Sequence, residues 1–116
     1  MTAVDRSELP AVGPDPSFQL PSFRRATLGN GMRLWAGEHC RSPVLSLILL
    51  IPSGAADDPP GQFGLAALTA DLLDEGSRDR SAVEIHEALT RIGGHLAINA
   101  SSDATVLSLT TLPKHA

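Results

Sequence analysis

The spacing of apolar positions predicts three strands in the first half of the chain. Residues 23–28 (FRRATL) and 32–37 (MRLWAG) are typical of a hairpin, because Asn30 and Gly31 between them tolerate the positive φ angles of a tight turn. After Pro43, residues 44–51 (VLSLILLI) form a continuous apolar run broken only by a serine. Such a run predicts a strand buried on both faces and covered by helices on at least one side.

A first helix is predicted over residues 63–75, after the Gly/Pro/Asp-rich loop 52–61. Gly76 is placed to end it in a left-handed conformation. The apolar residues that trace one face of this helix are Leu65, Ala66, Leu68, Leu72 and Leu73.

A second helix has the clearest local signal in the chain. Ser81 and Glu84 have the spacing of a capping box, in which the serine hydroxyl accepts from the Glu84 N–H and the Glu84 carboxylate returns to Ser81. Gly93 and Gly94 follow as the stop signal. Its apolar stripe consists of Ile85, Ala88, Leu89 and Ile92.

Two further strands are predicted before the end of the chain, with Ser101 to Asp103 as the turn between them. The apolar positions that alternate with polar or small residues are Leu96, Ile98 and Ala100, then Leu107 and Leu109. The element order is therefore β-β-β-α-α-β-β. It predicts an α+β fold with a mostly antiparallel sheet and helices packed on one face.

Composition narrows the class of protein without naming a function. A 42% apolar and 19% charged chain of 116 residues fits one domain or part of one. Residues 1–21 contain four prolines and are predicted to be a flexible arm, which leaves 22–116 as the folded part. A net charge of −4 without a Lys/Arg cluster argues against a nucleic-acid partner.

The sequence also bears on the compartment. No apolar run is long enough to span a membrane, and the N-terminus lacks the apolar core of a secretory signal. We therefore expect a cytoplasmic protein, with the periplasm or secretion as alternatives if a leader has been removed. The lone Cys40 makes no internal disulfide and does not settle the question.

Residue chemistry alone reveals no active site. The four histidines, at positions 39, 86, 95 and 115, show no metal-binding spacing, and His86 is expected on the polar side of its helix. We interpret Asp71, Asp74 and Glu75 as part of a solvent-exposed helix face. Asp57-Asp58 is interpreted as a pair of residues that favours a turn. Ser53 lies outside any G-x-S-x-G pattern. No catalytic or metal residue is therefore assigned, and a substrate-binding residue is unknown.

The order of motifs nevertheless resembles one family. The strings L-x-N-G-M-R-L and P-V-L-S-L-I-L-L-I-P-S-G-A-A-D-D-P-P-G-Q-F-G-L-A are similar to the start of insulinase/pitrilysin-type peptidases, which include mitochondrial processing peptidase. Gly76-Ser77, then residues 80–85 (RSAVEI) and Gly93-Gly94, continue the match. The resemblance covers residues 23–112 and implies the N-terminal portion of the family's domain.

The resemblance also implies a departure at the zinc site. In this family G-x-A leads into an inverted H-x-x-E-H motif, whose histidines bind zinc while the glutamate activates the metal-bound water. Laying Gly64-Leu65-Ala66 on G-x-A puts Ala67 and Asp71 at the two histidines and Ala70 at the glutamate. The family's last ligand, a later glutamate, would fall beyond Ala116.

A second departure lies in the strand that holds substrate in active members. The family's pattern here is N-A-x-T-S-x-E-x-T. In the same register this chain has Ala97 in place of the asparagine and Asp103 in place of the glutamate, while Ser101 and Thr105 are retained. Asn99 lies two residues late, so the substrate role is not transferred to it.

The resemblance thus implies a non-catalytic member that is not an enzyme by itself. We expect it to hold no cofactor, although active members hold zinc, and to pair with an active zinc-peptidase copy around a substrate chamber, or to self-associate. Two alternatives stay open: part of an active zinc endopeptidase whose ligands lie outside this chain, and a small α+β interaction module. The family's domain is longer than this chain, which predicts a fragment or a truncated form.

Overall fold

The computed structural model describes residues 13–15, 17–39 and 42–115, and the chain divides into two compact units, 1–40 and 41–116. Much of the predicted flexible arm, residues 1–12 and 16, lies outside the described residues. The predicted boundary between an arm and a domain at residue 22 therefore stays a prediction.

The first unit contains the predicted hairpin. Strand β1 (Phe23–Thr27) pairs antiparallel with β2 (Arg33–Gly37) in continuous register. The turn differs from the prediction, because only Gly31 has a positive φ, of 85°. The Gly31 N–H donates to the Leu28 carbonyl, and the Leu28 N–H donates to the Met32 carbonyl. This is a three-residue loop with glycine in the left-handed position, a common alternative to the two-residue turn.

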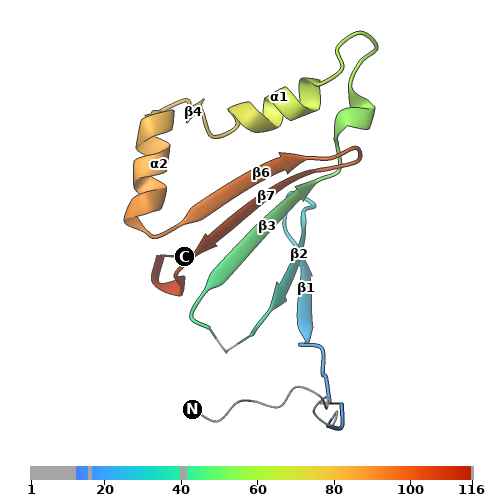
Figure 1. Cartoon of the computed structure of the whole chain (residues 1–116), viewed down its shortest axis with the longest axis vertical. Helices are drawn as coiled ribbons and strands as arrows, with labels where there is room; N and C mark the ends of the chain where they lie inside the picture. The colour runs from blue at the N-terminus through green and yellow to red at the C-terminus, as the bar shows by residue number, and fades with distance from the viewer. Residues whose placement is uncertain (1–12, 16, 40–41, 116) are drawn as a thin grey trace, which may run out of the picture. The chain divides into compact units, whose positions relative to one another are not determined.

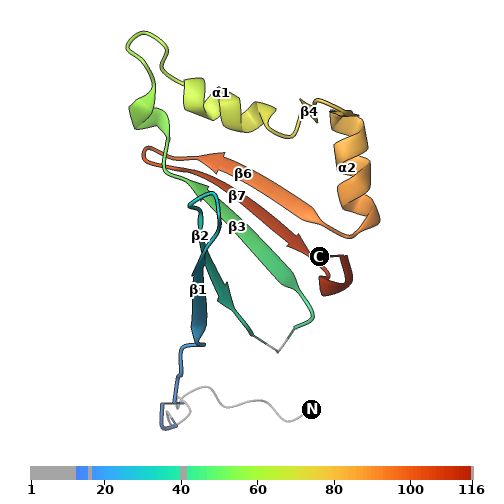
Figure 2. The same ribbon diagram turned by 180° about the vertical axis from the view of Figure 1, so that it is seen from behind.

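The second unit is built on a three-stranded antiparallel sheet (Figures 1 and 2). Its order is β3 (Leu45–Ile51), β7 (Thr105–Thr111) and β6 (His95–Ala100), so the last strand of the chain is central. All seven residues of β3 pair with β7, from Leu45 opposite Thr111 to Ile51 opposite Thr105.

Helix α1 (Leu65–Leu72) lies along β6 (Figure 1) and is shorter than predicted. It does not end in a left-handed glycine. The chain leaves the helix at Leu73, whose N–H donates to the Ala70 carbonyl, and Gly76 has a φ of 153° in a short strand instead. That strand, β4 (Gly76–Ser77), pairs with β5 (Arg80–Ser81), a two-residue ladder the sequence did not predict.

Helix α2 (Ala82–Arg91) confirms its prediction at both ends. The Ser81 N–H donates to Glu84 Oε2 at 2.8 Å, and the Glu84 N–H donates to Ser81 Oγ at 3.4 Å. These hydrogen bonds, the Ser81 backbone N–H foremost, hold the pKa of Glu84 below its ordinary value. At the other end Gly93 has a φ of 62°, and the Gly94 N–H donates to the Leu89 carbonyl, which together form a Schellman motif.

The loop after β3 is anchored to the β6–β7 turn. It contains the short 3-10 helix η1 (Ala55–Asp57), and the N–H groups of Ala55 and Ala56 donate to the carbonyls of Ser101 and Ser102, each at 2.9 Å. A Cβ atom on Gly54 would lie 2.3 Å from the Ser101 oxygen. Glycine is therefore required here because a side chain would not fit. Its φ angle is not the reason, since the Gly54 backbone is extended.

Burial does not follow the prediction for residues 44–51. Within β3, the five residues Leu47 to Ile51 are between 40% and 71% exposed, so this strand is not buried on both faces. Among the described residues only Gly54, Ala70 and Thr111 are buried. The apolar run indicates that the strand requires cover, but the main contacts of α1 and α2 with this sheet are to β6.

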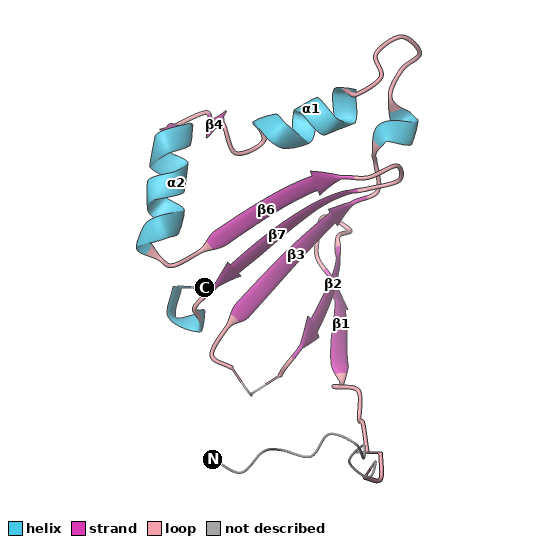
Figure 3. Ribbon diagram, in the orientation of Figure 1, coloured by secondary structure: helices cyan, strands magenta, loops and turns pink. Residues whose placement is uncertain are grey.

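The predicted α+β class and the order of the seven main elements are confirmed (Figure 3). The short elements added are η1, β4, β5 and a final 3-10 helix, η2 (Pro113–His115). Within the described part of the chain, no helix has both the length and the apolar content that crossing a membrane requires.

Candidate functional site

The candidate metal ligands do not converge. His39 follows β2, His86 lies on α2, His95 opens β6 and His115 ends η2, and all four are exposed. Cys40 lies outside the described residues. Across residues 13–15, 17–39 and 42–115, no three His, Cys, Asp or Glu side chains are grouped so that they could hold a metal ion.

The helix singled out by the sequence, α1, separates its three positions of interest. Ala70 is 3% exposed, on a helix that contacts β6. Ala67 and Asp71 are exposed. Two alanines contribute no lone pair, so Asp71 provides the only side-chain ligand among the three.

The face of α1 that contacts the sheet also differs from the predicted one. Ala66 is half-buried and Ala70 is buried, whereas Leu65, Leu68 and Leu72 are between 43% and 56% exposed. Small side chains therefore occupy the buried side, and a stripe of leucines at helical spacing is left on the outside.

The start of α1 is held by a residue that sequence reasoning assigned to a turn. Both carboxylate oxygens of Asp58 accept from the first backbone N–H groups of the helix: Oδ2 from Gly64 at 2.7 Å and Leu65 at 3.1 Å, and Oδ1 from Ala66 at 2.9 Å. Gly64, at the N-cap position, has no side chain to do this. The negative charge also suits the positive end of the helix dipole.

A hollow of about 300 Å³ lies between α1, the end of β3 and the start of β7. Its apolar wall includes Ile51, Leu65 and Leu73. Two of its hydroxyls are already engaged, because Thr69 Oγ1 donates to the Leu65 carbonyl at 2.7 Å and Thr105 Oγ1 donates to the Ser53 carbonyl at 2.9 Å. The retained Thr105 is therefore used within the fold, as is Ser101, whose hydroxyl donates to the Ala104 carbonyl.

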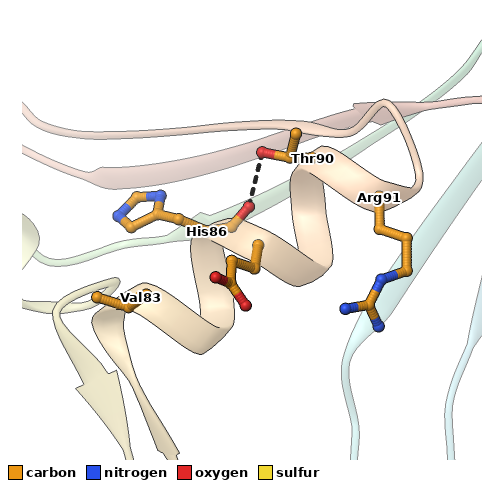
Figure 4. A pocket seen from close by; sticks show the side chains of 5 residues that line it. Val83, His86, Thr90 and Arg91 are labelled. Atoms are coloured by element: carbon orange, nitrogen blue, oxygen red, sulfur yellow. Dashed lines mark hydrogen bonds between the residues drawn. The ribbon is translucent and has the colours of Figure 1, made fainter.

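A second, open hollow of about 530 Å³ lies on the outer face of α2 (Figure 4). Its side chains do not converge, since His86 and Arg91 point to different sides of the helix. His86 Nε2 lies 4.0 Å from Asp74 Oδ2, and both side chains are partly exposed. This pair agrees with the prediction that His86 lies on the polar side of its helix, and it places Asp74 against α2 rather than in a carboxylate pair.

Comparison with known proteins identifies the class of protein. Residues 37–116 match the insulinase family of peptidases, peptidase family M16, so the chain belongs to this family. The predicted resemblance is confirmed. A comparison with curated protein sequences gave no match.

Solved structures of this class share the fold. A peptidase M16 inactive domain from Pseudomonas fluorescens has a TM-score of 0.73 and 24% identity, over 78% of this chain and 22% of that one. A protease from Helicobacter pylori has a TM-score of 0.77 and 22% identity, over 84% of this chain and 24% of that one. The chain thus spans less than a quarter of either structure.

Proposed function

We propose that this chain is a non-catalytic insulinase-type domain, which acts by pairing with an active zinc-peptidase copy of the same family around a substrate chamber. The observation that carries the proposal is the set of residues on α1. A helix that follows the family's G-x-A segment has Ala67, Ala70 and Asp71 in the register of H-x-x-E-H. Peptide hydrolysis by the family's zinc motif requires imidazole ligands at the two histidine positions and a general base at the glutamate position.

The environment of α1 supports the same conclusion. Ala70, in the register of the glutamate base, is buried on a helix that contacts β6, where a carboxylate would be taken out of water. Asp71 is exposed, and within the described residues it belongs to no group of three or more His, Cys, Asp or Glu side chains that could hold a metal ion. Furthermore, one solved structure with this fold is itself an inactive domain of the family.

The uncovered apolar surface supports the pairing part of the proposal. The outer leucines of α1 and both faces of β3 are exposed to an extent that a self-sufficient domain avoids. A partner from the same family would offer a surface of the same architecture to cover them.

The test measures zinc and cleavage on the purified chain. After incubation with zinc and dialysis, we expect no stoichiometric metal by atomic spectroscopy, and no cleavage of a fluorogenic peptide library that EDTA abolishes. Asp71→Ala is the matched variant, and we expect it to behave like the unchanged chain. One equivalent of bound zinc, or EDTA-sensitive cleavage, would contradict the proposal.

A second measurement addresses the pairing. The probe is a chain from the same genome with an intact H-x-x-E-H motif, mixed with this one and analysed by size-exclusion chromatography and peptide cleavage. We expect a stable complex with higher peptidase activity than the active chain alone. If the two chains elute separately and activity is unchanged, the pairing is wrong, while the zinc result still decides whether this chain is catalytic.

A further inference from the structure

The turn of the β1–β2 hairpin contains Asn30, one of the two asparagines in the chain, and Gly31 follows it directly. Asparagine is a thermally labile residue, because the backbone nitrogen of the next residue can attack its side-chain amide. Glycine hinders this attack least, since it has no Cβ atom and adopts φ angles that other residues avoid. Gly31 has such an angle, with a φ of 85°. The turn therefore combines a reactive side chain with the least hindered nucleophile.

In the closed hairpin, hydrogen bonds hold both reacting groups. The Gly31 N–H donates to the Leu28 carbonyl at 2.9 Å, which favours the protonated, unreactive form of this nitrogen. Asn30 Oδ1 accepts from the Met32 N–H at 3.1 Å, which ties the side-chain amide to the backbone beyond the glycine. All of these groups belong to residues 28–32, so their geometry does not depend on what packs around the hairpin. The attack therefore requires that the turn opens first.

We propose that Asn30 is a modification site, at which the chain deamidates spontaneously at a rate set by the opening of the hairpin. The Gly31 nitrogen loses its proton to hydroxide and forms a bond to Asn30 Cγ. The bond from Cγ to the side-chain nitrogen then breaks, and this nitrogen takes a proton from water and leaves as ammonia. A water molecule opens the resulting cyclic imide at one of its two carbonyls, which gives aspartate or isoaspartate at position 30.

The two products differ in their effect on the turn. Aspartate keeps a side-chain oxygen in place of Asn30 Oδ1, so the hydrogen bond from the Met32 N–H is retained. Isoaspartate brings the side-chain carbon into the main chain, so the path from residue 30 to Gly31 gains one methylene. The hydrogen bonds of the loop to Leu28 then no longer match the register of β1 and β2. Both products add a negative charge, but only isoaspartate disrupts the turn.

The first test measures which asparagine reacts. The full chain is incubated at mildly alkaline pH, folded in buffer and unfolded in guanidinium chloride, and its peptides are analysed by mass spectrometry for replacement of the amide NH₂ by OH. Asn99 is the internal control, because it lies within β6 and is followed by Ala100. We expect loss of the Asn30 amide in both samples, more slowly in the folded one, with Asn99 intact in the folded chain.

Two results would overturn the proposal. One is an Asn30 amide that survives in the folded chain after the unfolded chain has converted completely. The other is an equal rate of loss at Asn30 in the two samples, because the closed turn would then offer no protection. The turn lies outside residues 37–116, the part that matches the family, so neither result bears on the proposed function.

The second test changes the stability of the hairpin and leaves the reacting residues untouched. Arg25 Cζ lies 5.4 Å from the centre of the ring of Trp35, its cross-strand partner. Arg24 is opposite Ala36 instead, on the other face of the hairpin. We expect Arg25→Gln to raise the deamidation rate of the folded chain about 2- to 5-fold, because an exposed cation–π contact that favours the closed hairpin is lost. Arg24→Gln should leave the rate unchanged. Equal rates in the two variants would exclude control by hairpin opening.

Discussion

At the scale of single residues, Asp58 makes the most consequential set of hydrogen bonds in the described chain. It precedes α1 by several residues, yet its carboxylate receives three N–H groups at the start of that helix. Helix capping is normally predicted from a Ser, Thr, Asp or Asn directly at the N-cap. Here that position is Gly64, and the loop between folds the aspartate back onto the helix. A sequence pattern with fixed spacing could not reveal this role.

We expect Asp58→Ala to lower the free energy of unfolding by about 1–2 kcal/mol, because three N–H groups lose their acceptor and the helix dipole loses its counter-charge. Asp71→Ala removes the same charge from an exposed position of the same helix and should change stability by less than about 0.5 kcal/mol. Urea unfolding followed by circular dichroism compares the two. Equal effects would mean that the capping hydrogen bonds contribute little.

At the scale of elements, the two helices show what sequence reasoning can and cannot predict. In α2 the predicted stripe is the half-buried one: Ile85, Ala88, Leu89 and Ile92. Helix α2 has one mainly apolar side with charged residues opposite, so its pattern indicates which face is buried. In α1 apolar residues occur on nearly every side, and periodicity alone cannot tell which face meets β6. The same limit applies to the candidate site. Alignment with the H-x-x-E-H motif predicts which residues of α1 stand at its positions, but it does not predict which of them are buried.

The capping box of α2 leads to a pH-dependent prediction. The pKa of Glu84 is lowered from 4.5 by its hydrogen bonds to Ser81, so the folded state favours the carboxylate. The resulting stabilisation is complete above the unfolded pKa and is lost as the pH falls through the lower folded pKa. Glu84→Gln cannot titrate. We therefore expect the melting temperature of the unchanged chain to fall more than that of Glu84→Gln between pH 7 and pH 3.

Parallel melting curves for Glu84→Gln and the unchanged chain would show that the capping box does not couple folding to protonation.

At the scale of the whole molecule, the described chain has paired strands and capped helices but little side-chain core. Ala70 and Thr111 are its only buried residues that carry a side chain, and no large apolar side chain is fully buried among the described residues. The strand ladders and helix caps are thus formed, while little side-chain surface is buried. The chain spans less than a quarter of the solved structures it resembles.

A small core predicts a small heat-capacity change on unfolding, because that change follows the apolar surface newly exposed. A compact protein of 116 residues would give about 1.4–1.7 kcal/mol/K. Calorimetry of the purified chain should give a clearly lower value. A value within the compact range would mean that the apolar faces are buried in solution.

The anchor between the loop after β3 and the β6–β7 turn has a consequence for the order of folding. Strands β6 and β7 are joined by a short turn, so they can pair early, whereas Thr105 meets Ser53 only across 52 residues of sequence. Closing that longer loop carries the larger entropic cost, so we expect β3 to join last. Until it does, its apolar residues are free in solution, and chains made at high concentration would meet one another through this segment before folding is complete.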